Sequence, residues 1–220
     1  MKTMSDSRAA IVRAIEASGV IAVIRLQDPA RLRAVVDALA AGGVRALEVT
    51  MTVPGAVELI RALAPTLSAE FLLGAGTVVN AETAERVIDA GARFVVSPVL
   101  RPEVIAVGHR HDVPVMPGCF SPTEILTAWE AGADVVKVFP ATALGPTFFK
   151  DVRGPLPQVK LMPTGGVTID NAGDWIRAGA VAVGVGTALL DAAAIAAGNY
   201  GVITENARRI VANVAKARAS

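Results

Sequence analysis

The stretch ADVVKVFPA, residues 133–141, is an apolar run interrupted by one lysine, Lys137. A run that is apolar at nearly every position is typical of a strand buried on both faces, as in a parallel sheet covered by helices. It follows Ala131 and Gly132, a typical helix ending, because glycine readily adopts the left-handed conformation that closes a helix. The stretch therefore predicts a helix, a tight turn and a buried parallel strand.

This unit recurs along the chain. Similar Ala-Gly helix endings occur at Gly42, Gly91 and Gly179. The apolar runs are spaced about 20 to 26 residues apart, which leaves room for one helix and two loops in each interval. Eight such runs begin near Val20, Arg45, Phe71, Phe94, Pro114, Val135, Val159 and Val181.

Eight strands that alternate with helices predict an α/β fold with a parallel sheet, and eight units close naturally into a (β/α)₈ TIM barrel. An extra N-terminal helix, over about residues 6–18, precedes the first strand and is placed to plug the lower end of the barrel. A doubly wound open sheet is the alternative. Because the sequence has no linker or composition break, we expect residues 1–220 to form a single barrel domain.

Composition excludes several classes of partner. The 21 basic and 20 acidic residues nearly cancel and form no basic patch, so we expect no nucleic-acid partner. No apolar stretch approaches the roughly 18 residues of a membrane span, and residues 1–8 lack the apolar core of a secretory signal. The single cysteine, Cys119, excludes an internal disulfide framework. We therefore expect a cytoplasmic protein with no membrane partner.

Two charged side chains interrupt predicted strands near their middle. Lys137 lies in the sixth strand and Glu48 lies in the second, within ALEVT, whereas Arg25 ends the first strand. Barrel enzymes place their chemistry at the carboxyl ends of the strands, and side chains alternate between the two faces of a strand. If Lys137 and Glu48 both point inward, they meet in the upper interior of the barrel.

This pair has two interpretations. It is either a buried ion pair that only holds the strands together, or an amine nucleophile beside a carboxylate. A lysine in an apolar site has a lowered pKa and attacks a carbonyl as the free amine, forming a Schiff base. A nearby carboxylate can then move protons. The sequence contains no metal-binding motif.

Two glycine-rich loops follow the seventh and eighth strands. Gly165 and Gly166 lie in MPTGGVT, and Gly186 and Thr187 lie in VGVGTALL. Loops at these two positions often form a phosphate site in barrels, because glycines let backbone N–H groups approach an anion. The alternative is that these glycines only make tight turns.

At these same positions the sequence closely resembles the family of 2-keto-3-deoxy-6-phosphogluconate (KDPG) and 4-hydroxy-2-oxoglutarate (KHG) aldolases. The resemblance covers about residues 20–190. The motifs that carry it are GGVRALEVT (42–50), GAGTV (74–78), VVSP (95–98), PGCFSPTE (117–124), VKVFPA (136–141), Gly145-Pro146 and PTGGV (163–167).

The resemblance implies a class I lyase that needs no metal or other cofactor, built as a TIM barrel and usually a homotrimer. By it, Lys137 forms the Schiff base with pyruvate, and Glu48 is the acid and base. The phosphate-binding residues that it implies are Gly165, Gly166, Gly186 and Thr187. The residues that it implies for the pyruvate carboxylate and the pocket are Arg25, Thr52, Thr77, Pro98, Phe139 and Thr164.

One position departs from part of the family. Some members carry an arginine four residues after the glutamate, which binds the substrate carboxylate, and this chain has Thr52 there. Members with the same Thr-Val-Pro pattern instead have an arginine at the end of the first strand. Arg25 occupies that place, so the resemblance assigns the carboxylate to Arg25.

We therefore expect reversible cleavage of KDPG to pyruvate and glyceraldehyde 3-phosphate. KHG and the galactose-derived epimer of KDPG are the alternative substrates, and the sequence does not decide which hydroxyl configuration is preferred. Two further alternatives are an isomerase or epimerase on a phosphate-binding barrel, and a non-catalytic oligomeric scaffold.

Overall fold

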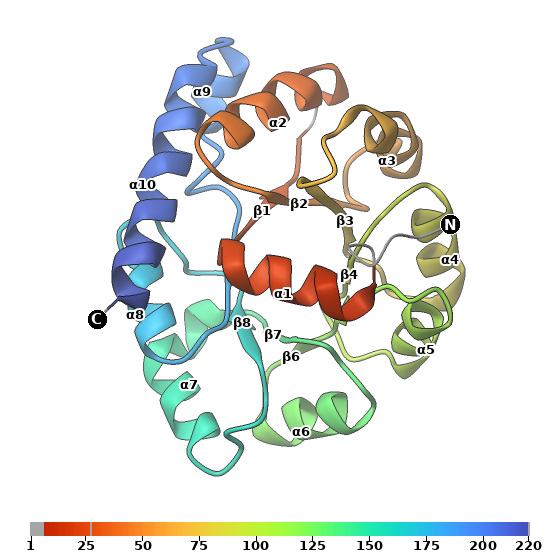
Figure 1. The fold of residues 1–220 in the computed structure, drawn as a ribbon, viewed down its shortest axis with the longest axis vertical. Coiled ribbons are helices and arrows are strands. Elements are labelled where there is room, and N and C mark those ends of the chain that lie inside the picture. Colours follow the sequence, from red (N-terminus) through yellow and green to blue (C-terminus); the bar gives the residue numbers. More distant parts are fainter. Residues whose placement is uncertain (1–6, 27, 220) are drawn as a thin grey trace.

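The computed structural model describes residues 7–26 and 28–219, and these form a ring of parallel strands surrounded by helices (Figure 1). The strand segments within the described residues lie close to the predicted apolar runs. They are β1 (Val20–Ile24), β2 (Ala46–Thr50), β3 (Leu72–Gly76), β4 (Val95–Val96), β5 (Val115–Met116), β6 (Gly118–Cys119), β7 (Val136–Val138), β8 (Leu161–Pro163) and β9 (Val183–Val185).

The strand pairings confirm the prediction of a parallel α/β fold. One sheet has the order β5-β4-β3-β2-β1-β9, and a second has the order β6-β7-β8. Single parallel bridges, Leu161 with Ala180 and Thr164 with Gly184, join the β8 segment to the β9 segment. The sheet therefore curls round so that its first and last strands, β1 and β9, are neighbours, as the barrel prediction requires.

The predicted fifth strand is divided into β5 and β6 by Pro117. Proline has no N–H group to donate to a neighbouring strand, so the ladder is interrupted there. The carbonyl of Pro117 still accepts a hydrogen bond from the N–H of Lys137, at 2.9 Å. Nine short segments thus correspond to eight strand positions among the described residues.

The helices other than α1 surround the strands on the outside of the ring (Figure 1). Asn80 and Ser121 cap α4 and α6 as their sequences predict, and Ser121 forms a reciprocal capping box with Glu124. The helices are α1 (Arg8–Ser18), α2 (Leu32–Ala41), α3 (Ala56–Leu63), α4 (Ala81–Asp89), α5 (Pro102–Arg110), α6 (Pro122–Glu130), α7 (Gly145–Arg153), α8 (Ala172–Arg177), α9 (Ala192–Ala196) and α10 (Tyr200–Arg218).

Two helices begin a few residues after a polar side chain that caps a turn. The Asp28 side chain caps a 3₁₀ turn over Pro29–Arg31 by accepting from the N–H of Ala30, and α2 begins only afterwards. Thr168 exchanges hydrogen bonds with Asn171 in a turn, and α8 begins only at Ala172. In both places a polar side chain satisfies a tight turn ahead of the helix.

Helix α1 lies across one end of the ring (Figure 1). Its buried residues Ile11, Val12 and Ile15 pack with the apolar side chains that fill the interior, including Phe94 and Met116. This arrangement confirms that the leading helix covers the lower end; residue 6, where the predicted helix began, lies outside the described residues. The opposite end, where the strands finish, carries the loops of the candidate site.

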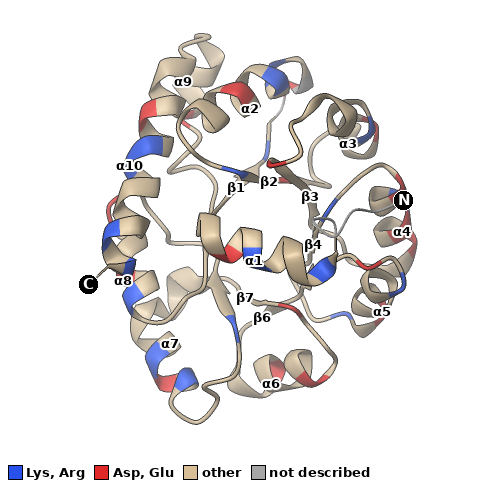
Figure 2. Ribbon diagram, in the orientation of Figure 1, with Lys and Arg blue, Asp and Glu red and all other residues tan. Residues whose placement is uncertain are grey.

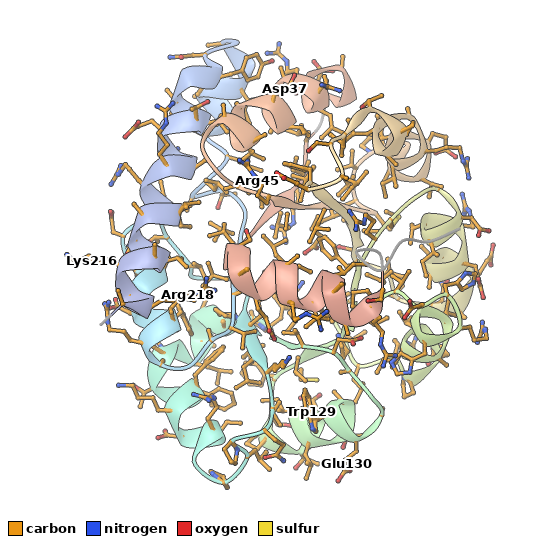
Figure 3. All side chains as sticks on the ribbon, viewed as in Figure 1. Asp37, Arg45, Trp129, Glu130, Lys216 and Arg218 are labelled. Carbon is orange, nitrogen blue, oxygen red and sulfur yellow. The ribbon has the colours of Figure 1, made fainter. Side chains whose placement is uncertain are left out.

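Polar contacts fasten α1 to the rest of the chain. The Arg8 guanidinium lies 3.2 Å from the Asp134 carboxylate, and Lys160 lies 2.7 Å from Glu16. Arg218, at the end of α10, donates to the carbonyl of Ala17 at 2.7 Å, and it lies near α1 in Figure 3.

Charged residues elsewhere are spread over the outer helices (Figure 2). None of the helices that the structure describes is both long and apolar enough to cross a membrane.

Candidate active site

Lys137 and Glu48 are both buried within the barrel. Lys137 is 3% exposed and Glu48 is 1% exposed. Lys137 is central in β7, where its register partners are Gly118 on β6 and Met162 on β8. Its Nζ atom lies 4.9 Å from the centroid of the Phe139 ring, close enough for a cation–π contact when the amine is protonated.

Burial moves the pKa values of the two groups toward their neutral forms. The pKa of Lys137 is lowered, chiefly by desolvation and further by the charge of Arg25, while the charge of Glu48 opposes the shift. The pKa of Glu48 is raised, chiefly by desolvation, and the charges of Lys137 and Arg25 oppose that shift. The site thus favours a free amine, which is the nucleophilic form of lysine.

The Glu48 carboxyl group lies over a glycine. A Cβ atom added to Gly76, the last residue of β3, would lie 1.8 Å from Glu48 Oε1. The other carboxyl oxygen, Oε2, is buried and has no hydrogen-bond partner among the described residues. Because buried polar atoms are nearly always hydrogen-bonded, Oε2 is available to a ligand or a water molecule. This role of Gly76 was not predicted from the sequence, although a glycine within a strand is a signal of close approach.

Two threonines contribute unusual features to the same end of the barrel. Thr77, directly after β3, has a φ angle of 60°, which residues other than glycine rarely adopt and which is often found at functional sites. Thr164, after β8, is 4% exposed, and its Oγ1 has no hydrogen-bond partner among the described residues. A Cβ atom added to Gly184 would lie 2.4 Å from Thr164 Oγ1, so the hydroxyl occupies the space that a side chain at Gly184 would need.

The predicted phosphate loops and three of the predicted pocket residues line one cavity of about 100 Å³. Gly165 and Gly166 adopt φ angles of 92° and 73°, a backbone conformation that favours glycine over other residues. The Arg25 Nη1 atom is 3.6 Å from the position of a Cβ atom on Gly186. The predicted residues that line the cavity are Arg25, Phe139, Thr164, Gly165, Gly166, Gly186 and Thr187.

Thr77, Lys137 and Glu48 are not among the residues that line this cavity, and neither are Thr52 and Pro98. Thr52 is exposed, and its Oγ1 lies 2.7 Å from the hydroxyl of Thr50, which donates to the carbonyl of Ile24. Pro98 is half-buried, and its backbone leaves no room for a Cβ atom on Gly118, the neighbour of Lys137. Thr52 thus contacts Thr50, at the end of the strand that carries Glu48, and Pro98 lies against Gly118, which pairs with Lys137.

Cys119 is buried, and its Sγ donates to the carbonyl of Glu124. Burial and the charge of Glu124 raise the pKa of its thiol to about 12, so the reactive thiolate is disfavoured. Among residues 7–26 and 28–219, no three or more His, Cys, Asp or Glu side chains are grouped so that they could hold a metal ion.

The candidate site thus contains a buried lysine with a free-amine tendency and a buried carboxyl group, and two glycine loops lie at the carboxyl ends of the strands; these groups are suited to chemistry on a carbonyl compound. The chain belongs to the KDPG and KHG aldolase family, which it matches over residues 11–206. It is therefore assigned to the aldolases, which are lyases.

The matches to individual relatives span most of this chain and most of each relative. The chain is 39% identical over 195 residues to 2-dehydro-3-deoxy-phosphogluconate aldolase of Treponema pallidum, a match that covers 88% of this chain and 92% of the relative. It is 35% identical over 212 residues to KHG/KDPG aldolase of Escherichia coli, covering 96% and 98%.

Among solved structures, the fold is similar to that of KDPG aldolase from Legionella pneumophila, with a TM-score of 0.84 and 33% identity. That similarity covers 90% of this chain and 97% of the other. In that structure pyruvate was captured at low pH as a covalent carbinolamine intermediate.

Proposed function

We propose that this protein is a class I aldolase that cleaves KDPG reversibly to pyruvate and glyceraldehyde 3-phosphate. The observation that carries the proposal is a buried lysine of lowered pKa that interacts electrostatically with a buried carboxyl group, Glu48, whose Oε2 atom has no partner among the described residues. The cavity lined by the glycine loops supports a phosphorylated substrate.

In the cleavage direction, the free amine of Lys137 attacks the C2 ketone of the 2-keto acid. Glu48 transfers the protons that convert the carbinolamine to a protonated imine, with loss of water. Glu48 then accepts the proton of the C4 hydroxyl as the C3–C4 bond breaks, and the bonding electrons move into the imine. The aldehyde leaves, the enamine is protonated at its terminal carbon, and water hydrolyses the imine to release pyruvate.

Other side chains bind the charged ends of the substrate in this proposal. Gly165, Gly166, Gly186 and Thr187 hold the phosphate through backbone N–H groups and the threonine hydroxyl. Thr77 and Arg25 bind the pyruvate carboxylate; the position of Arg25 beside Gly186 also brings its charge close to the phosphate.

The remaining pocket residues act on the substrate or on the lysine. The unpartnered hydroxyl of Thr164 supports a hydrogen bond to a substrate hydroxyl or to the phosphate. Phe139 packs beside the lysine, and Pro98 and Thr52 shape the surroundings.

A borohydride trap tests the mechanism. The protein is incubated with pyruvate, reduced with sodium borohydride and analysed by peptide mass spectrometry. We expect a pyruvate-sized addition on Lys137 and none in a Lys137→Met variant. A folded protein that forms no adduct would overturn the proposal and favour a phosphate-binding isomerase or a non-catalytic scaffold.

The choice of substrate is tested by comparing kcat/KM for KDPG, its galactose-derived epimer and KHG. Phosphate binding predicts that KDPG is cleaved more efficiently than KHG, which has no phosphate group. Equal efficiencies would show that the glycine loops contribute little, and a preference for the epimer would assign the alternative substrate.

The proposal extends to the working form of the enzyme. We propose one barrel domain over residues 1–220, a homotrimer, a cytoplasmic location and catalysis without a metal ion. The pairing of β1 with β9 supports a single barrel domain. Catalysis without a metal ion is supported by the protonated imine of the proposed mechanism, which serves as the electron sink. Activity that persists after treatment with a chelator is the expected result for the last point.

A further inference from the structure

A second and larger cavity adjoins the one lined by the glycine loops. Its volume is about 460 Å³, and it shares Val23, Arg25, Gly186 and Thr187 with the smaller cavity. It extends away from these shared residues toward α9 and the segment after β1. Its volume lies within the range of about 300–1,000 Å³ typical of small-molecule sites, whereas the smaller cavity holds little more than one compact group.

The walls of the larger cavity are mainly apolar. Leu26 comes from the segment after β1, and Leu190, Ala192 and Ile195 come from the segment that ends in α9. A phosphorylated three-carbon aldehyde held by the glycine loops has no apolar group to place against these walls. The cavity is therefore surplus to the cleavage of KDPG.

Two of the three charged side chains that line this cavity, Asp28 and Arg31, are paired with each other, and the third, Arg25, lies at the boundary shared with the smaller cavity. Arg31 donates from Nε to the Asp28 carboxylate at 3.0 Å. Its Nη1 donates to the carbonyl of Ala196 at 3.0 Å and also to that of Ile195. These bonds hold α9 against the segment after β1. The Nε and Nη1 atoms of Arg31 therefore already donate to acceptors of the protein. In the part of the cavity beyond Arg25, an apolar group consequently fits better than a second anion.

We propose that the larger cavity is a second acceptor subsite, which takes the apolar tail of an unphosphorylated aldehyde during aldol addition to pyruvate. This inference rests on the proposed Schiff-base function. The pyruvate enamine on Lys137 forms a C–C bond to the aldehyde carbon, and the aldehyde oxygen takes up a proton to become the C4 hydroxyl. Water then hydrolyses the imine and releases a 4-hydroxy-2-oxo acid, while the tail lies past Gly186 and Thr187 against Leu190 and Ile195.

The proposal predicts a dependence of rate on chain length. With saturating pyruvate and straight-chain aldehydes from propanal to heptanal, we expect kcat/KM to rise about threefold to fourfold per methylene group, because each buried methylene contributes a transfer free energy of this size. Product formation is followed by chromatography of the 4-hydroxy-2-oxo acids.

Matched variants locate the effect. Ala192→Phe fills the cavity from α9, whereas Ala193→Phe adds the same ring to an exposed position that does not line it. We expect Ala192→Phe to abolish the rise with chain length and Ala193→Phe to keep it. Trapping of pyruvate on Lys137 checks that the site is assembled in each variant, and Ala196→Phe fills the same cavity if Ala192→Phe fails that check.

The outcomes separate the two proposals. Absence of a pyruvate adduct in the wild-type protein overturns the proposed function itself. An adduct together with a flat chain-length series, or a rise that both Ala192→Phe and Ala196→Phe retain, overturns the acceptor subsite alone.

Discussion

At the scale of single residues, burial of Lys137 makes stability depend on pH. The folded pKa of this lysine is lowered below the unfolded value of about 10.4 by desolvation. Between these two values the unfolded chain holds a proton that the folded chain lacks. The contribution of this group to the free energy of unfolding therefore rises with pH in that window and is smallest below it.

Replacement of Lys137 by methionine removes the titrating amine, and with it this pH-dependent contribution to the free energy of unfolding and the cost of burying a charge. Relative to the wild type, we expect Lys137→Met to be most stable at pH 7, and this difference in the free energy of unfolding to shift in favour of the wild type as pH rises toward 10. Urea unfolding of both proteins at pH 7, 8, 9 and 10 measures it. A difference that stays constant with pH would mean that Lys137 remains protonated in the folded protein.

Gly76 positions the Glu48 carboxyl group by leaving it space. A methyl group at Gly76 would lie 1.8 Å from Glu48 Oε1, so Gly76→Ala must displace the carboxyl group from its place in the site. We expect kcat to fall by about 10²-fold, the usual range for loss of a positioned acid–base group, with a changed pH profile.

Gly74→Ala is the matched control in the same strand. Its added methyl group would meet the Phe94 ring in the barrel interior, at 2.4 Å, rather than the carboxyl group. We expect lower stability in this variant with the pH profile of the wild type. Identical pH profiles for both variants and the wild type would contradict the role of Gly76.

At the scale of elements, the capping box of α6 fixes the loop that follows the strand neighbouring Lys137. The Ser121 hydroxyl accepts from the N–H of Glu124, and the Glu124 carboxylate accepts from the N–H groups of Ser121 and Phe120. We expect Ser121→Ala to cost about 1 kcal/mol and to lower the melting temperature by roughly 2–4 °C. Calorimetry measures the change, and Thr123→Ala, outside these hydrogen bonds of the cap, is the control.

The elements were predictable where one local signal decided them. Apolar runs located the strands because each is buried on both faces. Asn80 and Ser121 are local signals of the same kind, since their side chains accept hydrogen bonds from nearby backbone N–H groups at the starts of α4 and α6. Pro117 and Thr168 were harder: the break at Pro117 depends on its missing N–H facing a neighbouring strand, and Thr168 caps a turn as well as it could cap a helix.

The site was predictable in its residue types more than in its geometry. The mid-strand positions of Lys137 and Glu48 indicated buried charge, and glycines at two strand ends indicated a common cavity. The close approach of Glu48 to Gly76 depends on the side-chain torsions of a residue on another strand. The larger cavity beside Leu190 and Ile195 depends on how α9 packs against the segment after β1, which no local pattern specifies.

At the scale of the whole molecule, three exposed apolar side chains lie on loops after neighbouring strands. Val79, Val99 and Phe120 are 37%, 46% and 42% exposed and follow β3, β4 and β6. Exposed apolar groups of this kind favour contact with another protein surface. They support the proposed homotrimer and are the residues that we expect to contribute to its interface.

Light scattering tests this prediction. We expect a mass of three chains for the wild type and a smaller mass for the Val99→Asp, Phe120→Asp double variant, because two buried charges would be unpaired in the interface. Ala193→Asp adds a charge to an exposed helix position elsewhere and should leave the mass unchanged. A monomeric wild type would exclude the trimer, and a trimeric double variant would place its interface on another surface.

The contact between α1 and Arg218 has a consequence for the order of folding. The hydrogen bond from Arg218 to Ala17 joins residues 201 positions apart, and α1 packs against side chains from strands along the whole chain. Contacts of such long range form only after the intervening chain is arranged, because loop closure costs entropy. We therefore expect the contacts of α1 with the ring to form late in folding, after α10 is complete. In an Arg218→Ala variant, we expect amide hydrogen exchange to accelerate in α1 before it does in the strands.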